Sequence, residues 1–325
     1  MPRVNPIEIR QLSYNALVAH GAGETEADAV AQAVARAEET GNIICGLYYL
    51  ESYCLQLASG RVQGRVDPEL SQPRPGAILA NAGFGFAQPA FAKGLPMAVE
   101  AARNNGIASL AIAHSHTCTS LGYFTEQIAQ EGLIGMGFTN ASAIVAGPGG
   151  KAPVLGTNPF AVTIPGDDAP RMHADFSTSA VALGKITMAK AAGEKIPLGW
   201  AVDADGVPTT DPDAALSGAL VSAGGYKGWA LGLLVECLAA GLTGSVNSVD
   251  VKGLKLADGP PHDLGQFYIL IDPNAQGGNL NGTLDRIVDA MKSDPDARIP
   301  GADRRILSEI NVDDALWEKF SKLAG

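Results

Sequence analysis

The chain has few basic residues for its length. Lys and Arg together number 23 against 34 Asp and Glu, so the formal net charge of the 325 residues is −11 at pH 7. Nucleic acids and anionic membranes are bound through basic surfaces, and this charge balance argues against both as partners. A small anionic ligand is still compatible with it, because a few cationic side chains and helix N-termini can be concentrated locally.

Cysteines are few and scattered. The four of them, Cys45, Cys54, Cys118 and Cys237, contain no C-x-x-C pair. Such a pattern is poor both as a disulfide framework and as a zinc signature. We therefore expect a reducing compartment and no bound metal.

Long apolar segments are also missing. The first ten residues, MPRVNPIEIR, lack the apolar core of a secretory signal. The longest apolar run, 229–242, is interrupted by Glu236 and by glycines, which indicates a buried helix rather than a membrane span. We expect a cytoplasmic protein that does not enter a membrane.

The common nucleotide-binding motifs are absent as well. No G-x-G-x-x-G lies between an expected strand and an expected helix, and there is no P-loop. The GFGF at 83–86 has the wrong spacing for a dinucleotide motif. Neither a Rossmann domain nor an NTPase is supported.

The residues that are abundant indicate a compact enzyme. Hydrophobic residues make up 46% of the chain and glycines number 39, a profile typical of a folded protein with many tight turns. Periodicity predicts two amphipathic helices within 5–40 and a third over 47–57. Strands and helices then alternate, which predicts a layered α/β portion. Strands are expected at 77–82, 107–115, 133–141, around 160–176 and at 263–274, with helices at 86–106, 121–132, 183–196, 224–244 and 279–293.

The two ends of the chain are expected to be helical. We therefore predict an α/β protein in which residues 1–75 and 275–325 form one mainly helical domain, for substrate binding and dimerisation. Residues 76–274 are expected to form the sheet domain against which it packs.

A polar segment, HSHTCTSLGY at 114–123, begins where an expected strand ends and a helix starts. Ligand-binding residues in open α/β sheets lie at such strand ends, so His114, His116 and the following hydroxyls are candidates for binding. A plain alternative is that the hydroxyls cap the helix and the histidines are surface groups. A zinc site of His114, His116 and Cys118 is geometrically awkward, because alternating ligands need an extended backbone and a fourth partner.

Two further segments end in hydroxyl, amide or carboxylate groups. GTNPFAV at 156–162 offers Thr157 and Asn158, which suit a carboxylate or amide ligand, although Asn-Pro is also a turn signal. ADFSTS at 174–179 offers Asp175, which suits ribose hydroxyls, although capping of the next helix explains it equally well.

Two other segments combine glycine with cationic residues. GGYKG at 224–228 places glycines around Lys227, which lets a backbone approach a phosphate closely with a cation beside it. IPGADRR at 299–305 ends in two adjacent arginines that suit a phosphate clamp. The plain alternatives are a surface lysine and a solvated arginine pair.

Five segments taken together resemble one enzyme family. In chain order they are HSHTCTSLGY, PGGKAPVLGTNPFAV, DFSTSAVALGKI, GWAVDADGVPTTDP and GGYKGWALGLLVECLAAGLTG. They resemble the malate/L-lactate dehydrogenase superfamily, which is unrelated to the Rossmann lactate and malate dehydrogenases. That family also includes ureidoglycolate and sulfolactate dehydrogenases and Δ1-piperideine-2-carboxylate/Δ1-pyrroline-2-carboxylate reductases. The resemblance implies a non-Rossmann, NAD(P)-binding sheet domain and a homodimer, and it explains the missing glycine motif.

The chain departs from the family where the substrate is bound. The family usually has Ser-His-Gly after the second helix and an Arg three residues later, the His as proton donor and the Arg as grip on the substrate carboxylate. By position this chain has Ile44, Cys45, Gly46 and then Tyr49. A carbonyl or imine needs a proton as hydride arrives, so the usual donor is missing or has moved.

The other family positions can be matched residue by residue. His116 lies within one position of the family's strand-edge His and is the predicted acid/base, because an unperturbed imidazole titrates near neutrality. His114 and Cys45 are possible substitutes, and Lys185 stands where the imino-acid reductases place an Asp. The predicted catalytic residues are therefore His116, Cys45 and Lys185, and the predicted substrate contacts are Tyr49, Thr157 and Asn158. The predicted cofactor contacts are Thr117, Cys118, Thr119, Ser120, Leu121, Asp175, Leu183, Gly184, Tyr226, Lys227, Pro300, Gly301, Arg304 and Arg305.

The resemblance implies reduction of a small cyclic 2-imino acid, such as Δ1-pyrroline-2-carboxylate to L-proline, by NADPH or NADH, with NADPH favoured. The strand-edge Ser-His followed by Leu121, and FGFAQPAF at 84–91, favour this interpretation. Lys185 and GYKG favour a 2-hydroxyacid dehydrogenase instead. Loss of the family's donor and grip leaves a third hypothesis open, a catalytically silent nucleotide-binding protein.

Overall fold

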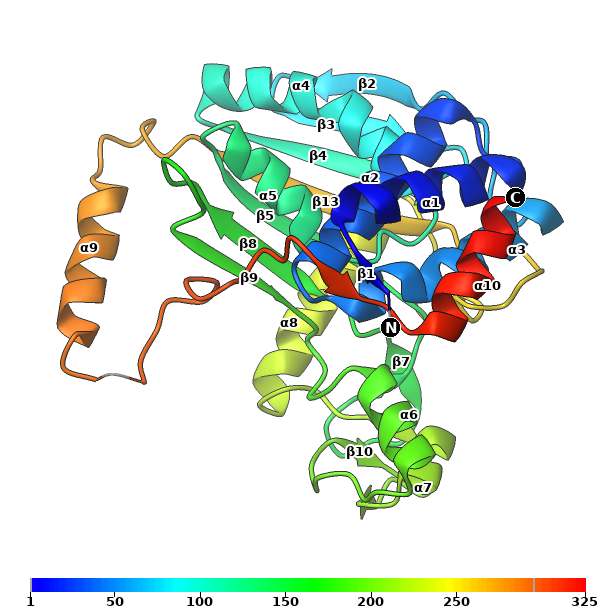
Figure 1. Cartoon of the computed structure of the whole chain (residues 1–325). Coiled ribbons are helices and arrows are strands. Elements are labelled where there is room, and N and C mark those ends of the chain that lie inside the picture. Colours follow the sequence, from blue (N-terminus) through cyan, green and yellow to red (C-terminus); the bar gives the residue numbers. More distant parts are fainter. Residues whose placement is uncertain (1, 295) are drawn as a thin grey trace.

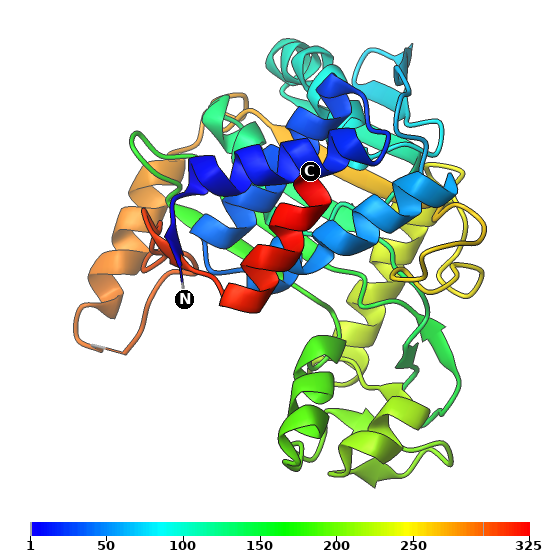
Figure 2. The same ribbon diagram turned by 45° about the vertical axis from the view of Figure 1, so that its right-hand side comes forward.

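The computed structural model describes residues 2–294 and 296–325. Its centre is a seven-stranded mixed sheet with helices on both faces, flanked by helices from both ends of the chain (Figure 1). A small lobe, residues 143–155 and 180–221, hangs from one edge of this body (Figures 1 and 2). This mixed α/β architecture with several sheets confirms the predicted fold class.

The large sheet has the strand order β2-β3-β4-β13-β5-β8-β9. Its strands are β2 (Glu69–Arg74), β3 (Ala77–Asn81), β4 (Ile107–Ser115), β13 (Leu264–Ile271), β5 (Ile134–Thr139), β8 (Phe160–Ile164) and β9 (Met172–Phe176). Strand β13 lies in the middle and runs antiparallel to both of its neighbours, β4 and β5.

Alternating side chains give the sheet two apolar faces. Tyr268 and Leu270 of β13 pack into the core beneath α4 (Ala87–Asn105) and α5 (Gly122–Gln130). Phe267 and Ile269 point the other way, toward Val235 of α8 (Tyr226–Glu236) and the π-helix that continues it (Cys237–Gly241). Both faces are therefore buried at the centre of the sheet, which explains why β4, β13 and β5 are apolar almost throughout, whereas the edge strand β2 is largely exposed.

Helices from both chain ends build a cap beside the sheet. They are α1 (Pro6–Ala19), α2 (Glu24–Glu39), α3 (Leu50–Ser59) and α10 (Asp314–Ala324). Asn5 and Glu8 form a capping box at the start of α1, which satisfies backbone N–H groups that a helix start leaves free. The short strands β1 (Arg3–Val4) and β14 (Ile310–Asn311) pair and bring the two ends together.

The small lobe has its own sheet and core. Its strands are β6 (Val145–Ala146), β7 (Pro153–Leu155), β10 (Ala201–Val202), β11 (Pro208–Thr209) and β12 (Ala219–Leu220), and its helices are α6 (Leu183–Ala192) and α7 (Pro212–Ser217). The sequence predicts a polar loop for much of 201–216, because strands of two residues carry no readable alternation.

Three observations refine the predicted organisation. Residues 69–74, expected to be a connector, form β2 and pair with β3, so the expected boundary at 75–76 falls inside a hairpin of the large sheet. Helix α10 was not expected, although it packs on α1 in the cap. Helix α9 (Leu280–Met291) was expected, but no other helix or strand that the structure describes packs along it (Figures 1 and 2).

The helices were also compared with the thickness of a membrane. Across residues 2–294 and 296–325, none is both long enough and apolar enough to span one.

Candidate active site

Sheet topology brings the predicted segments to one edge. Strand β4 ends at Ser115, and β13 begins beside it, with Leu264 paired to Ser115. Phe160 at the start of β8 pairs with Phe176 at the end of β9. Because β13 pairs with both β4 and β5, and β8 pairs with β5, these ends lie along the same sheet edge. The polar segments at 114–121, 157–158 and 175–179 therefore converge.

Cys45 and Tyr49 meet this edge from the cap. They lie in two short 3-10 helices, Ile43–Cys45 and Leu47–Tyr49, between α2 and α3. Burial, together with the negative charge of Asp175, raises the pKa of the Cys45 thiol to about 12. Burial likewise raises the pKa of Tyr49 to about 12, with smaller contributions from Cys45, Tyr48 and Cys118. Cys45 and Tyr49 are therefore close enough to interact electrostatically, and both are uncharged near neutral pH.

Asp175 is the acidic group of the site. Its Oδ2 accepts hydrogen bonds from the backbone N–H of Gly122 (2.7 Å) and from the Ser120 hydroxyl (3.4 Å). Solvent reaches Asp175, but the surrounding atoms desolvate its carboxylate and so raise its pKa, while the Gly122 N–H opposes this shift. A carboxylate held at a helix start in this way can accept further hydrogen bonds from hydroxyl groups.

The loop of residues 117–121 shows a mixed outcome. Thr117, Cys118, Ser120 and Leu121 are buried, and Leu121 belongs to the core under α4 and α5. Thr119 has a positive φ of 62° and is half-buried. Ser120 lies between Asp175 and the Asn42 side chain, which donates to its Oγ at 3.4 Å. Thr119 is thus the half-buried member of this loop, and Ser120 is buried with its hydroxyl held between Asp175 and Asn42.

His116 is not positioned as the predicted acid/base. It is 1% exposed, and its ring stacks on that of His262 with centroids 3.9 Å apart. Its Nε2 is 2.7 Å from Oε1 of Gln56. Desolvation, then the neighbouring His262, pushes the pKa of His116 well below its usual value of 6.5. The strand-edge position led to the prediction, but the ring turns into the protein instead of toward Asp175.

Gln56 fixes the proton on His116. The Gln56 amide nitrogen donates to the carbonyls of Leu254 (2.8 Å) and Leu256 (2.7 Å). Its Oε1 is therefore an acceptor, so the His116 Nε2 must carry a proton and donate it. The imidazole is neutral, and its N–H donates to Gln56 in a buried hydrogen bond. It therefore cannot donate a proton to a substrate.

The same loop, residues 251–262, is held by a second buried side chain. Arg61 is 1% exposed and donates to the carbonyls of Gly253 (3.0 Å), Leu256 (2.5 Å) and Pro260 (3.0 Å). Hydrogen bonds from a charged group are among the stronger ones in proteins. The side chains of α3 and its C-terminal turn thus fix the path of this loop, which lies beside α3 in Figure 2.

Thr157 and Asn158 differ in burial and in hydrogen-bond partners. Thr157 is half-buried, and its backbone carbonyl accepts from the N–H of Thr178 (2.9 Å), which ties it to the segment after Asp175. Asn158 is fully buried and donates to the Gly232 carbonyl (3.1 Å) and to Glu236 (2.7 Å). Asn158 therefore anchors helix α8, and the predicted substrate contact is wrong for this residue.

Two helix starts border the site. Helix α6 begins at Leu183, and a Cβ added to Gly184 would lie 3.5 Å from Cδ1 of Ile44, so this start packs close to the 3-10 segment. Lys185 in the first turn is exposed. No side chain caps either α6 or α8, which leaves their first N–H groups available to an anion.

The second helix start, at α8, matches the predicted phosphate segment. Gly224 and Gly225 both have positive φ, 62° and 64°, which favours glycine at the turn. Tyr226 and Lys227 follow, both exposed. The Ala223 N–H donates to the Thr178 carbonyl (2.9 Å), so this turn lies next to the segment that follows Asp175.

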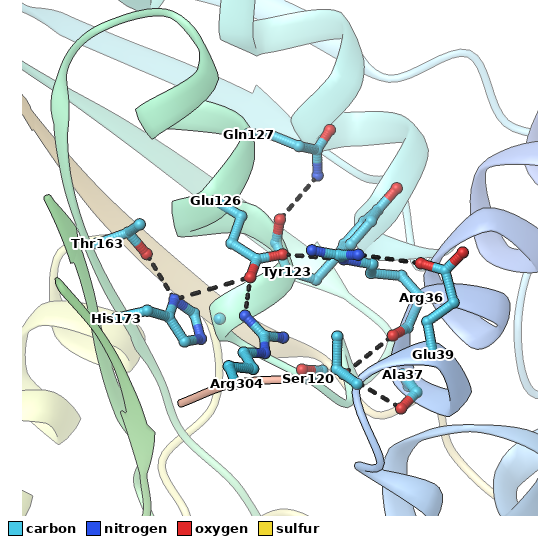
Figure 3. A network of polar contacts seen from close by, with 12 residues as sticks. Arg36, Ala37, Glu39, Ser120, Tyr123, Glu126, Gln127, Thr163, His173 and Arg304 are labelled. Atoms are coloured by element: carbon cyan, nitrogen blue, oxygen red, sulfur yellow. Dashed lines mark hydrogen bonds and ion pairs between the residues drawn. The ribbon is translucent and has the colours of Figure 1, made fainter. Parts of the chain in front are cut away.

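The arginine turn at 299–305 is used differently from the prediction. Glu126, 5% exposed, forms ion pairs with Arg304 and with Arg36, its Oε2 lying 3.2 Å from Arg36 Nε (Figure 3). Arg304 therefore has an internal partner, and the predicted cofactor contact is not supported for it. Arg305 is exposed.

Two neighbours of Arg304 hold the same turn on strand β9. The Pro300 carbonyl accepts from the His173 N–H (2.9 Å). Gly301 has a φ of 83°, and a Cβ there would come within 2.7 Å of the His173 carbonyl oxygen. A pocket of about 480 Å³ opens beside this turn, lined among others by Arg36, His173 and Arg304.

Some residues of the site region were not predicted. Gln56 and Arg61 carry no recognisable motif, because their partners lie roughly two hundred residues away in the chain. Lys255 was also missed, although its ammonium group lies 3.1 Å from the centroid of the Tyr48 ring. Its signal in the sequence, a lysine in the Gly- and Pro-containing loop GLKLADGPP, is too common to single out.

The donor set fits a dinucleotide better than a metal. Within the described residues, no group of three or more His, Cys, Asp or Glu is arranged to hold a metal ion. Asp175, two uncapped helix starts and exposed Lys227 instead offer a hydroxyl acceptor, phosphate-binding N–H groups and a cation. These are the groups that NAD(P)H requires.

Comparisons with known proteins agree with this chemistry. Residues 4–320 match the family model described as malate/L-lactate dehydrogenase. The chain is 40% identical over 306 residues to a Δ1-pyrroline-2-carboxylate reductase of Ancylobacter novellus, covering 93% of this chain and 90% of that protein. It is 38% identical over 304 residues to a (2R)-3-sulfolactate dehydrogenase (NADP(+)) of Chromohalobacter salexigens, with 92% and 90% covered. The crystal structure of the Δ1-piperideine-2-carboxylate reductase of Pseudomonas syringae pvar. tomato superposes with a TM-score of 0.92 at 33% identity, covering 99% of this chain and 100% of that one.

Proposed function

We propose that this chain, which belongs to the malate/L-lactate dehydrogenase family and is an NAD(P)-dependent oxidoreductase of that family, reduces small cyclic 2-imino acids. The substrate would be Δ1-pyrroline-2-carboxylate, giving L-proline, or Δ1-piperideine-2-carboxylate. Relatives at 40% and 37% identity carry these substrates in their names.

The observation that carries this proposal is the set of side chains at positions 45, 49 and 118. Burial raises the pKa of Cys45 and Tyr49 to about 12 and also raises that of Cys118, so these groups are poor proton donors near neutral pH. His116, the other predicted donor, is buried and committed to Gln56. A 2-oxo acid needs a proton on oxygen as it is reduced, whereas a cyclic imine that arrives protonated needs only hydride.

NAD(P)H supplies that hydride when it is bound. In this proposal Asp175 accepts hydrogen bonds from ribose hydroxyls, and the start of α8 with Lys227 binds phosphate. Ser120 orients the Asp175 carboxylate. NADPH is favoured over NADH, and the sulfolactate relative is named for NADP(+).

A 2-hydroxyacid dehydrogenase is the second candidate. The sulfolactate dehydrogenase at 38% identity favours it, and so does Lys185, exposed beside the start of α6 near Ile44. An ammonium group there would offer the proton that the thiols and the phenol withhold.

Substrate profiling distinguishes these functions. Oxidation of NADPH and NADH would be followed at 340 nm with Δ1-pyrroline-2-carboxylate, Δ1-piperideine-2-carboxylate, pyruvate, oxaloacetate and 3-sulfopyruvate. We expect kcat/KM for the cyclic imines to exceed that for every oxo acid at neutral pH. Turnover restricted to the oxo acids would replace the proposal with the dehydrogenase function, and cofactor binding without turnover of any substrate would indicate a silent protein.

The same assay carries a mechanistic control. If the imine is reduced as its protonated form, kcat/KM should fall as pH rises through the pKa of the free imine. Lys185→Met should leave imine reduction within about threefold of the unmodified protein, because general-acid effects are usually about a hundredfold or more. A hundredfold loss in this variant would favour Lys185 as donor.

A further inference from the structure

A lysine outside every predicted segment lies beside the candidate site. The Lys255 ammonium group is 3.1 Å from the centroid of the Tyr48 ring and 4.9 Å from that of Tyr49. Lys255 is exposed, and it forms neither an ion pair nor a side-chain hydrogen bond with any residue that the structure describes. Contact with an aromatic face attracts a cation but leaves its charge uncompensated.

Hydrogen bonds to the residues before and after Lys255 fix the backbone of the 251–262 loop at this lysine. The carbonyls of Leu254 and Leu256 both accept from the Gln56 amide, at 2.8 and 2.7 Å. Arg61 donates to the Leu256 carbonyl as well. The backbone of Lys255 is therefore clamped from both sides, and its exposed side chain is projected from a fixed point.

Charge is distributed unevenly across the site. Besides burial, the nearby Cys45 raises the pKa of Tyr49, and the nearby Asp175 raises the pKa of Cys45. Lys255 contacts the tyrosine end of this series, and Asp175 is at the other end. The residues from 42 to 50, NIICGLYYL, include no Lys or Arg. An anionic group entering between them would be attracted toward Lys255 and repelled by Asp175.

We propose that Lys255 binds the carboxylate of the substrate. This inference rests on the proposed function in so far as the substrate is a small 2-imino or 2-oxo acid, both of which carry that carboxylate. Tyr48 and Tyr49 hold the ammonium group over their rings, and Gln56 is a positioning residue that fixes the backbone of Lys255. His116 acts through Gln56, which gives this buried imidazole a role without proton transfer.

The test compares Lys255→Met with Lys252→Met. Lys252 is exposed in the same loop, and neither tyrosine ring contacts its ammonium group in the structure. Loss of a charged hydrogen bond to the carboxylate should raise KM for the cyclic imine roughly 10- to 100-fold in Lys255→Met. The KM for NADPH should stay unchanged, Lys252→Met should behave like the unmodified protein, and Lys255→Arg should restore most of the lost affinity.

A binding measurement separates this inference from the proposed function. Pyrrole-2-carboxylate and pyrrole-2-carboxamide are planar analogues that cannot be reduced at this bond and differ only in the charged group. The protein should prefer the carboxylate by tenfold or more, and Lys255→Met should abolish that preference. An undiminished preference in Lys255→Met would overturn the inference even if imine reduction is observed. Loss of the preference in a protein that turns over only oxo acids would sustain the inference and refute the imine function.

Discussion

At the scale of single residues, the stacked His116 and His262 pair shows how burial changes the pKa of a titratable group. The rings stack at an interplanar angle of 18°, and both residues are at most 2% exposed. Burial, followed by the charge of Arg61, lowers the pKa of His262 to about 3, and the pKa of His116 also falls well below its usual value. Both imidazoles are therefore neutral in the folded protein near neutral pH.

This pair predicts a pH dependence of stability. Below pH 6.5, the usual value, the unfolded chain binds protons at both imidazoles that the folded chain excludes. The free energy of unfolding should therefore decrease as pH falls, by about 1.4 kcal/mol per pH unit for each imidazole. For His262 the decrease should continue to about pH 3, where the folded protein takes up the proton too.

The measurement is urea unfolding at half-unit steps from pH 7.5 to 4.5, on the unmodified protein and on His262→Phe. Phenylalanine keeps a stacking partner for His116 but cannot titrate. The free energies of unfolding of the two proteins should converge or cross as pH falls. The variant has one imidazole fewer that takes up a proton on unfolding, so its stability depends less steeply on pH. Parallel curves over the whole range would show that His262 titrates normally in the folded protein.

At the scale of elements, the segment after α9 is fastened to the sheet and to the cap. We refer to residues 299–309 as the C-terminal strap. Arg304 of the strap and Arg36 of α2 share the carboxylate of Glu126 on α5, as Figure 3 shows. The Leu307 N–H donates to the Glu39 carbonyl (2.8 Å) at the end of α2. One buried carboxylate thus joins α2, α5 and the strap.

Glu126→Gln is expected to destabilise the protein by about 3 kcal/mol, because it leaves the partly buried Arg304 guanidinium without its counter-charge. Arg36 keeps its ion pair with Glu39. The matched control is Glu131→Gln, which breaks the exposed pair with Arg103, where the side chains are 45% and 56% exposed. That change should cost less than about 1 kcal/mol. Urea unfolding checks both, and equal effects of the two substitutions would contradict the role given to Glu126.

Elements with strong periodicity could be predicted, and those defined by distant partners could not. The helices at 6–19, 24–39 and 87–105 and the strands at 107–115 and 134–139 follow their apolar patterns closely. Strand β13 was expected, but its position between β4 and β5 depends on a register that local sequence does not contain. The two-residue strands of the small lobe carry no pattern at all.

The residues of the candidate site differ in the same way, since those with a local motif could be predicted and those defined by distant partners could not. Asp175 and the 224–228 turn could be proposed from the sequence because their motifs are local, and their ligand roles stay predictions. His116 and Asn158 were misassigned, since only contacts with Gln56 and Glu236, 60 and 78 residues away, turn these side chains inward. Lys255 has no local motif to mark it. A polar residue at a strand end can serve a ligand or the fold, and the choice is made by tertiary partners.

At the scale of the whole molecule, α9 leaves an apolar surface uncovered. Leu280, Ile287, Val288 and Met291 recur at helical spacing along it, next to Leu284, which is buried. Ile287 and Val288 are 44% and 40% exposed. An ion pair between Arg171 and Asp285 (2.5 Å) ties the helix to the β8–β9 hairpin. We expect a second copy of the chain to cover this face, as the family resemblance implies.

Ile287→Asp should therefore convert a homodimer into a monomer, because a charge buried without a partner is costly in an interface. Arg286→Asp is the control, since it places the same new side chain one residue away, off the apolar stripe. Light scattering coupled to size exclusion would give the masses. A monomeric unmodified protein, or a dimer that survives Ile287→Asp unchanged, would remove α9 as the contact.

The central position of β13 also has a consequence for synthesis. Its residues, 264–271, emerge from the ribosome more than a hundred residues after β4 and β5, yet they pair with both. Until then the nascent chain has two unpaired strand edges facing a missing neighbour, which is the kind of edge that recruits foreign strands. Closing the sheet requires long-range contacts, which form slowly. The nascent chain should therefore depend on chaperones most after β5 has emerged and before β13 has followed it.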